Sequence, residues 1–304
     1  MRNGLSDTGG KPAILLACDD AYMPGLIAAI NSVKRNIRGA KIYLVHDLTP
    51  EKLGLVQPFI YKAEKFDSSF WRHLLPRKNN DSPDKGAPSG YISFVNQGKY
   101  QPDIIEESHY FYMDCDVVIN KPFCFETPET LSCLINRKKS LIPLDPEEKP
   151  ITDGFRAMQQ FILSQGGQIE SGDIITVYTD GAYFSNRDWM VNALRPAIQK
   201  ASQNYPKGPK YFYSLDYFNA GIAMLGKPIE SWKIDEAIPL LNFMKKSEPW
   251  FLPDKAAELC HLIHFIGKKP WEFQRGAYPL EGGSVWWDYY LNGPMPPVTR
   301  GLPE

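Results

Sequence analysis

Apolar residues along the chain fall into short continuous runs, and the segments between these runs have helical spacing. Residues 12–18 are mostly aliphatic and predict a buried strand. Residues 23–36 follow with apolar positions at the spacing of an amphipathic helix, and residues 41–46 (KIYLVH) predict a second strand. This β-α-β order indicates a parallel sheet with a right-handed crossover.

Similar strand signals recur through the rest of the chain, and a helix-like segment lies at residues 186–205. Polar, Pro-rich and Gly-rich residues between 67 and 103 predict a long surface loop, and the Pro-rich tail after residue 291 predicts an irregular strap. Together these patterns predict an α/β fold with a central, mostly parallel mixed sheet flanked by helices. The further strand signals lie at residues 109–113, 140–144, 174–185, 217–225 and 259–267.

Composition narrows the functional classes. The 304 residues include 34 Lys and Arg against 35 Asp and Glu, so a net charge of -1 gives no reason to expect nucleic acid or an anionic membrane. The five cysteines form no CxxC pair and read as reduced thiols of a cytoplasmic protein. Because no secretory signal and no apolar stretch of membrane-spanning length is visible, we expect a soluble chain without a transmembrane segment. A homo-oligomer is compatible with these features.

Two carboxylates interrupt the apolar stretch HYFYMDCDVVINKPF, at Asp114 and Asp116. Unpaired buried carboxylates are costly, so a positively charged partner is implied. We expect the strand to end near Asp114, with the pair in the exit turn at the carboxyl edge of the sheet, where open α/β sheets bind ligands. A divalent cation is then the natural partner, although such a pair can also cap a helix or lie on a sheet edge.

A second polar constellation occurs in LCHLIHFIGKKPWEF, residues 259–273. Here His264 ends an apolar run, and Gly267, Lys268 and Lys269 follow it. Imidazole is a good third ligand for carboxylate-bound Mn²⁺, and lysine beside a glycine turn suits a diphosphate. His261 would point to the opposite face of a strand and is not expected to share the ion. A lone strand histidine is more often structural, so the prediction depends on this context.

Three separated motifs resemble those of the family 8 glycosyltransferases, the retaining GT-A group that includes glycogenin and bacterial lipopolysaccharide galactosyl- and glucosyltransferases. They are ACDDAYMPGLIAAINSVKRN near the start, FYMDCDVVINKPF in the middle and HFIGKKPW towards the end. The resemblance implies one GT-A domain with a Rossmann-like nucleotide-binding core over residues 1–304. Its nucleotide-binding half is expected at 11–125, its sugar and acceptor half at 126–275 and a C-terminal strap at 276–304.

The first motif of the resemblance implies a uridine site at Ala17, Asp19 and Tyr22. The Asp19 carboxylate would accept the uracil N3–H, whereas cytosine has no hydrogen on N3 and would repel it. The ring of Tyr22 would lie on the base. The alternative is that Asp19 only caps the helix that begins after Pro24.

The other two motifs imply the metal and diphosphate sites. Asp114, Asp116 and His264 would hold Mn²⁺ or Mg²⁺, with Asp114 also close to the ribose or sugar, and Gly267 would lie on the diphosphate with a lysine. The family pattern is H-F-x-G-x-x-K-P-W, and this chain is one residue shorter. Lys269 precedes Pro-Trp and matches the family lysine better, while Lys268 remains the alternative.

The residues expected to contact the sugar match the family less directly, because two alignments of this region to the family pattern are possible. Matching segments in chain order makes Asp180 the polar residue facing the sugar, Asp216 the retained acid and Asn219 its companion. It also puts Ser214 and Leu215 where the family has Asp and Gln, which leaves donor identity and turnover open. The other alignment matches residues 217–225 to the family's YFNxG strand. Asp216 lies near the site in both.

The resemblance therefore implies a retaining, Mn²⁺-dependent enzyme that moves a hexose, glucose or galactose, from a UDP-sugar to a hydroxyl of a saccharide, lipid-linked or protein acceptor. The alternatives are a non-catalytic nucleotide-sugar-binding protein and a metal-dependent nucleotidyltransferase. The acidic segment after the first strand disfavours the latter, which normally has a Gly-rich basic loop there. Trp271, Trp286, Trp287 and Tyr289 are candidates for an acceptor platform, with packing as the alternative.

Overall fold

The computed structural model describes eight stretches of the chain. The expected strand at residues 140–144 is covered only at its first residue, and Gly267 and Lys268 lie outside the described residues. The side chains of residues 134–140, 174–177, 179, 204, 214–216 and 231 are also outside the description. The described stretches are residues 11–71, 94–140, 174–204, 214–226, 229–231, 260–265, 269–277 and 282–298.

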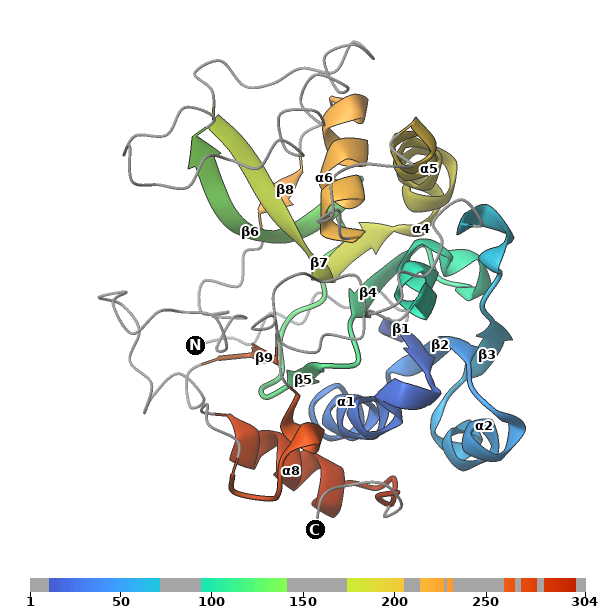
Figure 1. The fold of residues 1–304 in the computed structure, drawn as a ribbon, viewed down its shortest axis with the longest axis vertical. Helices are drawn as coiled ribbons and strands as arrows, with labels where there is room; N and C mark the ends of the chain where they lie inside the picture. The colour runs from blue at the N-terminus through green and yellow to red at the C-terminus, as the bar shows by residue number, and fades with distance from the viewer. Residues whose placement is uncertain are drawn as a thin grey trace, which may run out of the picture.

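A seven-stranded sheet with the order β3-β2-β1-β4-β7-β6-β8 forms the centre of the fold (Figure 1). The four strands on one side, β3 to β4, pair in parallel, whereas β7 runs antiparallel to both β4 and β6. The predicted mixed, mostly parallel sheet is therefore confirmed. The strands are β1 Ala13–Asp19, β2 Lys41–Asp47, β3 Lys62–Lys65, β4 His109–Met113, β6 Leu131–Ser140, β7 Ile174–Asn186 and β8 Glu230–Ser231.

A second, two-stranded sheet joins β5 Val117–Ile119 to β9 Leu262–His264 in antiparallel register. Val117 pairs with His264, and the Phe265 N–H donates to the Asp116 carbonyl at 2.9 Å. This ladder brings a segment from the C-terminal third of the chain beside the turn that follows β4.

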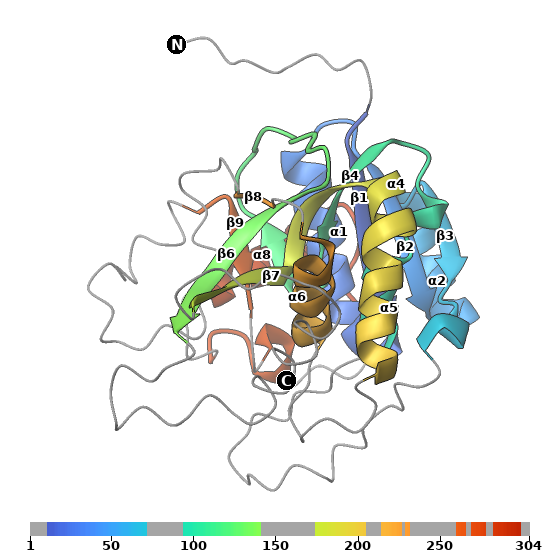
Figure 2. The same ribbon diagram turned by 90° about the horizontal axis from the view of Figure 1, so that it is seen from above.

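Helices cover both faces of the central sheet (Figure 2). Alternate residues of β1 point to opposite faces, so that Leu16 joins the core under α1 and α8, and Leu15 joins the core under α5 and α6. No helix in the described part of the chain is long and apolar enough to cross a membrane. The α-helices are α1 Met23–Asn36, α2 Pro50–Val56, α4 Arg187–Trp189, α5 Arg195–Asn204, α6 Ser214–Leu225 and α8 Gly283–Asn292, with a π-helical turn at Met190–Leu194.

Two sequence-based expectations about local structure were wrong. Residues 217–225 form part of helix α6 rather than a strand. A short, mostly apolar run suits either element, and here Gly221 lets the helix pack closely on Ile198 of α5. The described part of residues 67–103 is also more than a surface loop. Its 3₁₀ turns carry fully buried side chains, including Lys99 and Tyr100. The 3₁₀ turns of the fold are Asp20–Tyr22, Gln57–Phe59, Ser68–Trp71, Phe94–Tyr100, Pro102–Ile104 and Pro270–Glu272.

Helix α8 and the segment after it pack on α1. Trp286, Trp287 and Tyr289 are buried in this core, which supports the packing alternative over an acceptor platform. The buried Asn31 side chain of α1 ties the segment down, since its amide donates to the Tyr289 carbonyl at 2.9 Å and its oxygen accepts from the Met295 N–H at 2.8 Å.

Candidate metal and nucleotide site

The paired carboxylates lie in a turn between two strands. Strand β4 ends at Met113, and the Val117 N–H donates to the Asp114 carbonyl at 3.0 Å just where β5 begins. The Asp114 N–H in turn donates to the Gly181 carbonyl of β7 at 2.8 Å. The expected position in the exit turn of the strand is therefore confirmed, and the turn is held from two sides.

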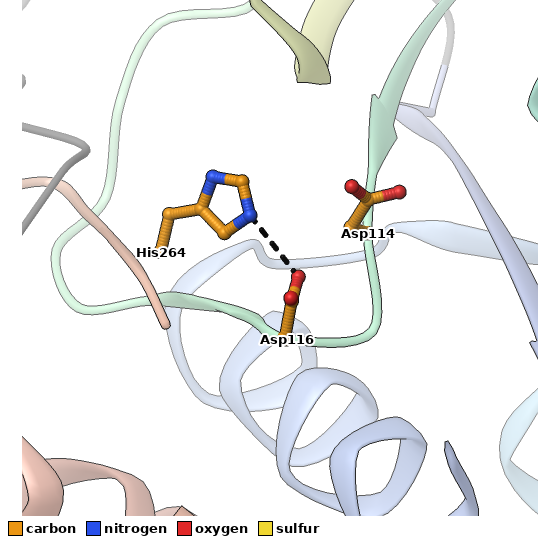
Figure 3. A group of neighbouring side chains, drawn as sticks. All are labelled: Asp114, Asp116 and His264. Carbon is orange, nitrogen blue, oxygen red and sulfur yellow. Dashed lines mark ion pairs between the residues drawn. The ribbon is translucent and has the colours of Figure 1, made fainter. Parts of the chain in front are cut away.

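Asp114, Asp116 and His264 converge in space although 150 residues of sequence separate Asp114 from the histidine (Figure 3). One ligand atom of each residue lies within 4.8 Å of the others, and His264 Nε2 is 3.2 Å from Asp116 Oδ1. His261 does not join them, because its Nδ1 lies 2.8 Å from the Pro122 carbonyl oxygen. The three residues that the sequence predicted as metal ligands are thus together.

The donor set fits a divalent cation. Two carboxylates and one imidazole are ligands that Mn²⁺ and similar ions accept. Asp116 Oδ1 is buried and accepts no well-formed hydrogen bond from any described residue, which is unusual for a buried carboxylate oxygen and is expected of an atom that binds an ion.

The two carboxylates differ in electrostatic environment. Burial raises the pKa of Asp114 to about 6, with the carboxylates of Asp116 and Asp180 adding to the rise and the Lys99 ammonium opposing it. Burial also disfavours ionised Asp116, but the Lys269 ammonium and His264 outweigh it and hold the pKa of Asp116 well below its usual range. The two groups therefore have distinct affinities for a proton.

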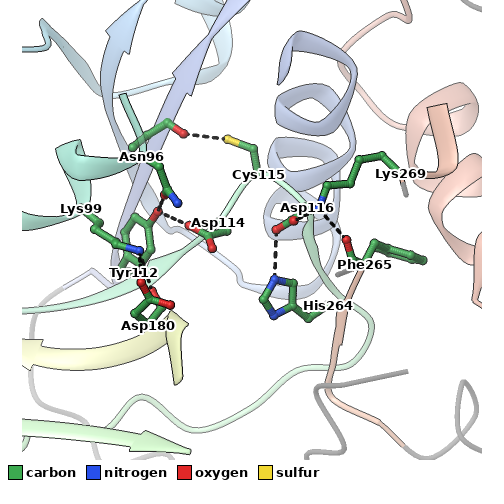
Figure 4. Close-up of polar contacts among 11 residues, drawn as sticks. Asn96, Lys99, Tyr112, Asp114, Cys115, Asp116, Asp180, His264, Phe265 and Lys269 are labelled. Carbon is green, nitrogen blue, oxygen red and sulfur yellow. Dashed lines mark hydrogen bonds and ion pairs between the residues drawn. The ribbon is translucent and has the colours of Figure 1, made fainter. Parts of the chain in front are cut away.

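Lys269 supplies the positive partner for Asp116. Its ammonium contacts Asp116 Oδ2 and donates to the Phe265 carbonyl at 2.8 Å (Figure 4). Its backbone N–H donates to the Glu272 carboxylate at 3.1 Å at the start of the 3₁₀ turn Pro270–Glu272. The ammonium is 6.0 Å from the ring centre of Tyr22. From the sequence, this lysine was predicted to contact a diphosphate, and its contact with Asp116 was not predicted.

The candidate uridine residues lie at the end of β1. Asp19 Oδ1 accepts from the Ala21 N–H at 3.0 Å and the Tyr22 N–H at 3.2 Å, so this carboxylate caps the 3₁₀ turn before α1 rather than α1 itself. The Tyr22 ring packs edge-on against Trp271, with ring centres 5.7 Å apart. Ala17 is buried just before the turn. A capping role and a base-reading role for Asp19 are compatible, because a carboxylate accepts several hydrogen bonds.

Tyr22 connects the uridine positions to the carboxylate pair. Burial, followed by the nearby charges of Asp116 and Asp114, raises the pKa of its phenol. The helix that carries Tyr22 at its entrance approaches closely because of Gly25. A Cβ on Gly25 would lie 2.5 Å from the Cys115 carbonyl oxygen and 2.8 Å from the Trp271 ring. The first motif and the carboxylate turn are therefore packed directly against each other.

Asp180 lies on the other side of Asp114 and is paired with a lysine that sequence reasoning missed. The Lys99 ammonium contacts the Asp180 carboxylate, and the Lys99 side chain is fully buried (Figure 4). The Tyr112 hydroxyl lies between them and Asp114, to which it donates a hydrogen bond. In the sequence, the only sign that Lys99 belongs to a site is that it follows Gly98, and the segment around it was predicted to be a surface loop.

The remaining predicted residues lie on α6. Asn219 holds the main chain of β7, since its oxygen accepts from the Tyr178 N–H at 2.8 Å and its amide donates to the Tyr178 carbonyl at 3.0 Å. This contact lies two residues before Asp180 and gives Asn219 a positioning role. Asp216 is on the first turn of α6, and its side chain lies outside the described residues. Catalytic roles for Asp216, Asp180 and Asn219 remain predictions.

Gly181 lies in close contact with both Asp114 and His264. A Cβ at this position would lie 2.5 Å from His264 Cε1 and 3.1 Å from both His264 Nδ1 and Asp114 Oδ2. The absence of a side chain therefore keeps the histidine and the carboxylate where they face each other. The sequence showed this glycine only as part of a strand signal.

Comparison with known proteins finds similarity in structure but not in sequence. No family model and no curated protein matches the chain. Among solved structures, galactosyltransferase LgtC, in complex with donor and acceptor sugar analogues, superposes with a TM-score of 0.57 at 15% identity, over 94% of this chain and 97% of that one. The fold is that of a GT-A glycosyltransferase.

Two further structural neighbours have longer chains than this protein. The bifunctional glycosyltransferase WbbM matches with a TM-score of 0.55 at 12% identity, over 94% of this chain and 50% of its own. The glycosyltransferase GlyE of Streptococcus pneumoniae TIGR4 matches with a TM-score of 0.52 at 17% identity, over 92% of this chain and 60% of its own. The resemblance that the three motifs carry is therefore confirmed at the level of the GT-A fold.

Proposed function

We propose that the protein is a retaining glycosyltransferase that moves a hexose, glucose or galactose, from a UDP-sugar to a hydroxyl acceptor with the help of Mn²⁺. The observation that carries the proposal is the convergence of Asp114, Asp116 and His264 at the edge of a GT-A fold. Asp19 and Tyr22 lie on the adjoining side of this cluster, where a nucleotide attached to a metal-bound diphosphate would reach.

Each residue then has a definite task. Asp19 accepts the uracil N3–H, Tyr22 contacts the base, and Lys269 stabilises the negative charge of the diphosphate leaving group. Asp114, Asp116 and His264 hold the divalent cation, which supplies Lewis-acid stabilisation of that same charge when bound. Asp180, fixed by Lys99, accepts hydrogen bonds from hydroxyls of the transferred sugar.

Retention of configuration needs no nucleophile on the protein. As the anomeric C–O bond breaks towards an oxocarbenium-like state, the departing phosphate oxygen takes the proton of the acceptor hydroxyl on the same face of the sugar. The protein contributes by holding donor and acceptor together and by placing positive charge where the leaving group becomes negative. The acceptor is a saccharide, a lipid-linked group or a protein hydroxyl.

A panel of UDP-sugars incubated with the protein and Mn²⁺ tests the proposal by UDP release, with EDTA in parallel. We expect release from UDP-glucose or UDP-galactose that EDTA abolishes and that Asp116→Asn reduces, while Asp288→Asn, on the outer surface of α8, leaves it unchanged. Tight binding of a UDP-sugar without any release, in the presence of acceptor sugars, would instead indicate a binding protein. Pyrophosphate formation from UTP and a sugar phosphate would indicate a nucleotidyltransferase.

A further inference from the structure

Two carboxylates, Asp114 and Asp116, belong to the candidate metal cluster, and a third, Asp180, lies near enough to Asp114 to act on its charge. Two of these three carboxylates already have an ammonium partner within the protein. Lys269 contacts Asp116, and Lys99 contacts Asp180. Asp114 instead accepts a hydrogen bond from the neutral hydroxyl of Tyr112. His264 is neutral when it binds a metal. The three carboxylates and the two ammonium groups together then offer a divalent cation a net charge of only about -1.

The Lys269 ammonium is fixed rather than merely close. Its side chain is only 10% exposed, and besides Asp116 it donates to the Phe265 carbonyl at 2.8 Å, on the strand-end residue that follows the ligand His264. Its backbone is held by Glu272 at the start of a 3₁₀ turn whose Trp271 packs on Tyr22. The Lys269 ammonium is therefore held beside Asp116 through contacts of both its side chain and its backbone.

A fixed ammonium next to a metal ligand repels a cation that binds alone. The same ammonium attracts a diphosphate, because lysine has three N–H donors and, among the described residues, two of them are used, by Asp116 and Phe265. A cation and a diphosphate entering together bring enough negative charge to offset Lys269, whereas a cation by itself does not.

We propose that Lys269 makes divalent-cation binding depend on the nucleotide diphosphate, so that the metal and the nucleotide enter the site as one unit. Lys269 is then a positioning residue for Asp116 as well as a diphosphate contact. The inference rests on the proposed function, since it assumes that a nucleoside diphosphate is the ligand, but its central test uses Mn²⁺ alone.

The test is to measure Mn²⁺ affinity of the full chain by electron paramagnetic resonance of free Mn²⁺, with and without UDP. In the wild type, UDP should tighten Mn²⁺ binding by about 100-fold or more. Lys269→Met removes the charge but keeps the length of the side chain, so Mn²⁺ alone should bind at least about ten-fold more tightly than in the wild type. UDP binding in the presence of Mn²⁺ should weaken by about ten-fold.

Lys269→Arg and Lys41→Met serve as controls. The arginine keeps the positive charge, and Mn²⁺ alone should bind as weakly as in the wild type. Lys41 also pairs with a carboxylate, Glu107 at 2.7 Å. It lies at the amino end of β2, whereas the candidate site follows the carboxyl end of the parallel strand β4, so its loss should change neither affinity. Thermal melting of each variant verifies that it is folded.

Equal or weaker Mn²⁺ binding in folded Lys269→Met would overturn the inference and assign Lys269 a purely structural role. If that variant does not fold, the wild type alone decides, because equal Mn²⁺ affinity with and without UDP contradicts the coupling. Failure of the proposed function looks different. In that case UDP does not bind the wild type in the presence of Mn²⁺, while the effect of Lys269→Met on Mn²⁺ alone is still measured.

Discussion

Gly181 allows a direct test of whether the geometry of the candidate metal site matters. An alanine Cβ at this position lies 2.5 Å from His264 Cε1, and ordinary contact begins at 3.4 Å, so the imidazole has to move by about 0.9 Å. Metal ligands tolerate only about 0.2 Å of misplacement. Because the Gly181 carbonyl accepts a hydrogen bond from the Asp114 N–H, strand β7 cannot easily move away from the imidazole.

Gly181→Ala should therefore remove His264 from the cluster without unfolding the protein. We expect UDP binding in the presence of Mn²⁺ to weaken by about ten- to 100-fold, which is about 1.4 to 2.8 kcal/mol. Stability should change little, since alanine is favoured over glycine in a strand by about 0.5 to 1 kcal/mol and this gain offsets part of the contact strain.

Isothermal titration calorimetry with UDP and Mn²⁺, beside a melting curve, measures both quantities. Gly54→Ala is the matched control, because Gly54 is exposed on α2 and its Cβ would meet no atom within 4 Å. A Gly181→Ala protein that melts normally and binds UDP and Mn²⁺ within two-fold of the wild type would refute the assignment of His264 as a metal ligand.

The other predictions concern the carboxylates. Replacing Asp114 or Asp116 by Ala should weaken metal-dependent UDP binding by about ten-fold or more, and unchanged calorimetric affinity in both variants would contradict the metal site. Asp19→Asn should keep its capping bonds but lose the preference for UDP over CDP in competition binding, whereas undiminished discrimination would leave Asp19 as a cap only. Asp216→Asn should abolish transfer while UDP affinity persists, and full activity would show that the sugar-side alignment is wrong. Asp180→Asn should instead lower the melting temperature, because the buried Lys99 ammonium loses its carboxylate at a cost of about 3 kcal/mol, and an unchanged melting curve would contradict this role.

Local pattern was enough to predict much of the sheet. The aliphatic run that forms β1, the helix α1 after it and the aromatic run of β4 were each visible, because buried strands and amphipathic helices have different periods. Pattern failed at α6, where residues 217–225 are apolar at most positions and form a helix that packs on α5. It also failed around Lys99, since a charged residue in a polar, Gly-rich segment gives no sign that its side chain is buried.

Chemistry in the sequence predicted the residues of the candidate metal site but not the charges around them. Asp114, Asp116 and His264 were identified because two carboxylates in an apolar stretch require a cation and a histidine at a strand end suits one. That Lys269 contacts Asp116, that Lys99 contacts Asp180 and that Gly181 makes room for His264 depend on which segments pack together.

The sequence by itself therefore determined most strands of the sheet, helix α1 and the candidate metal ligands, because hydrophobic period and ligand type are local properties of residues. Tertiary structure decided which of those side chains meet. The β5–β9 ladder brings His264 to the turn after β4, and the close approach of α1 at Gly25 brings Tyr22 to the same turn. Contacts between segments 90 to 150 residues apart follow from the packing of the whole chain, which no single stretch of sequence encodes.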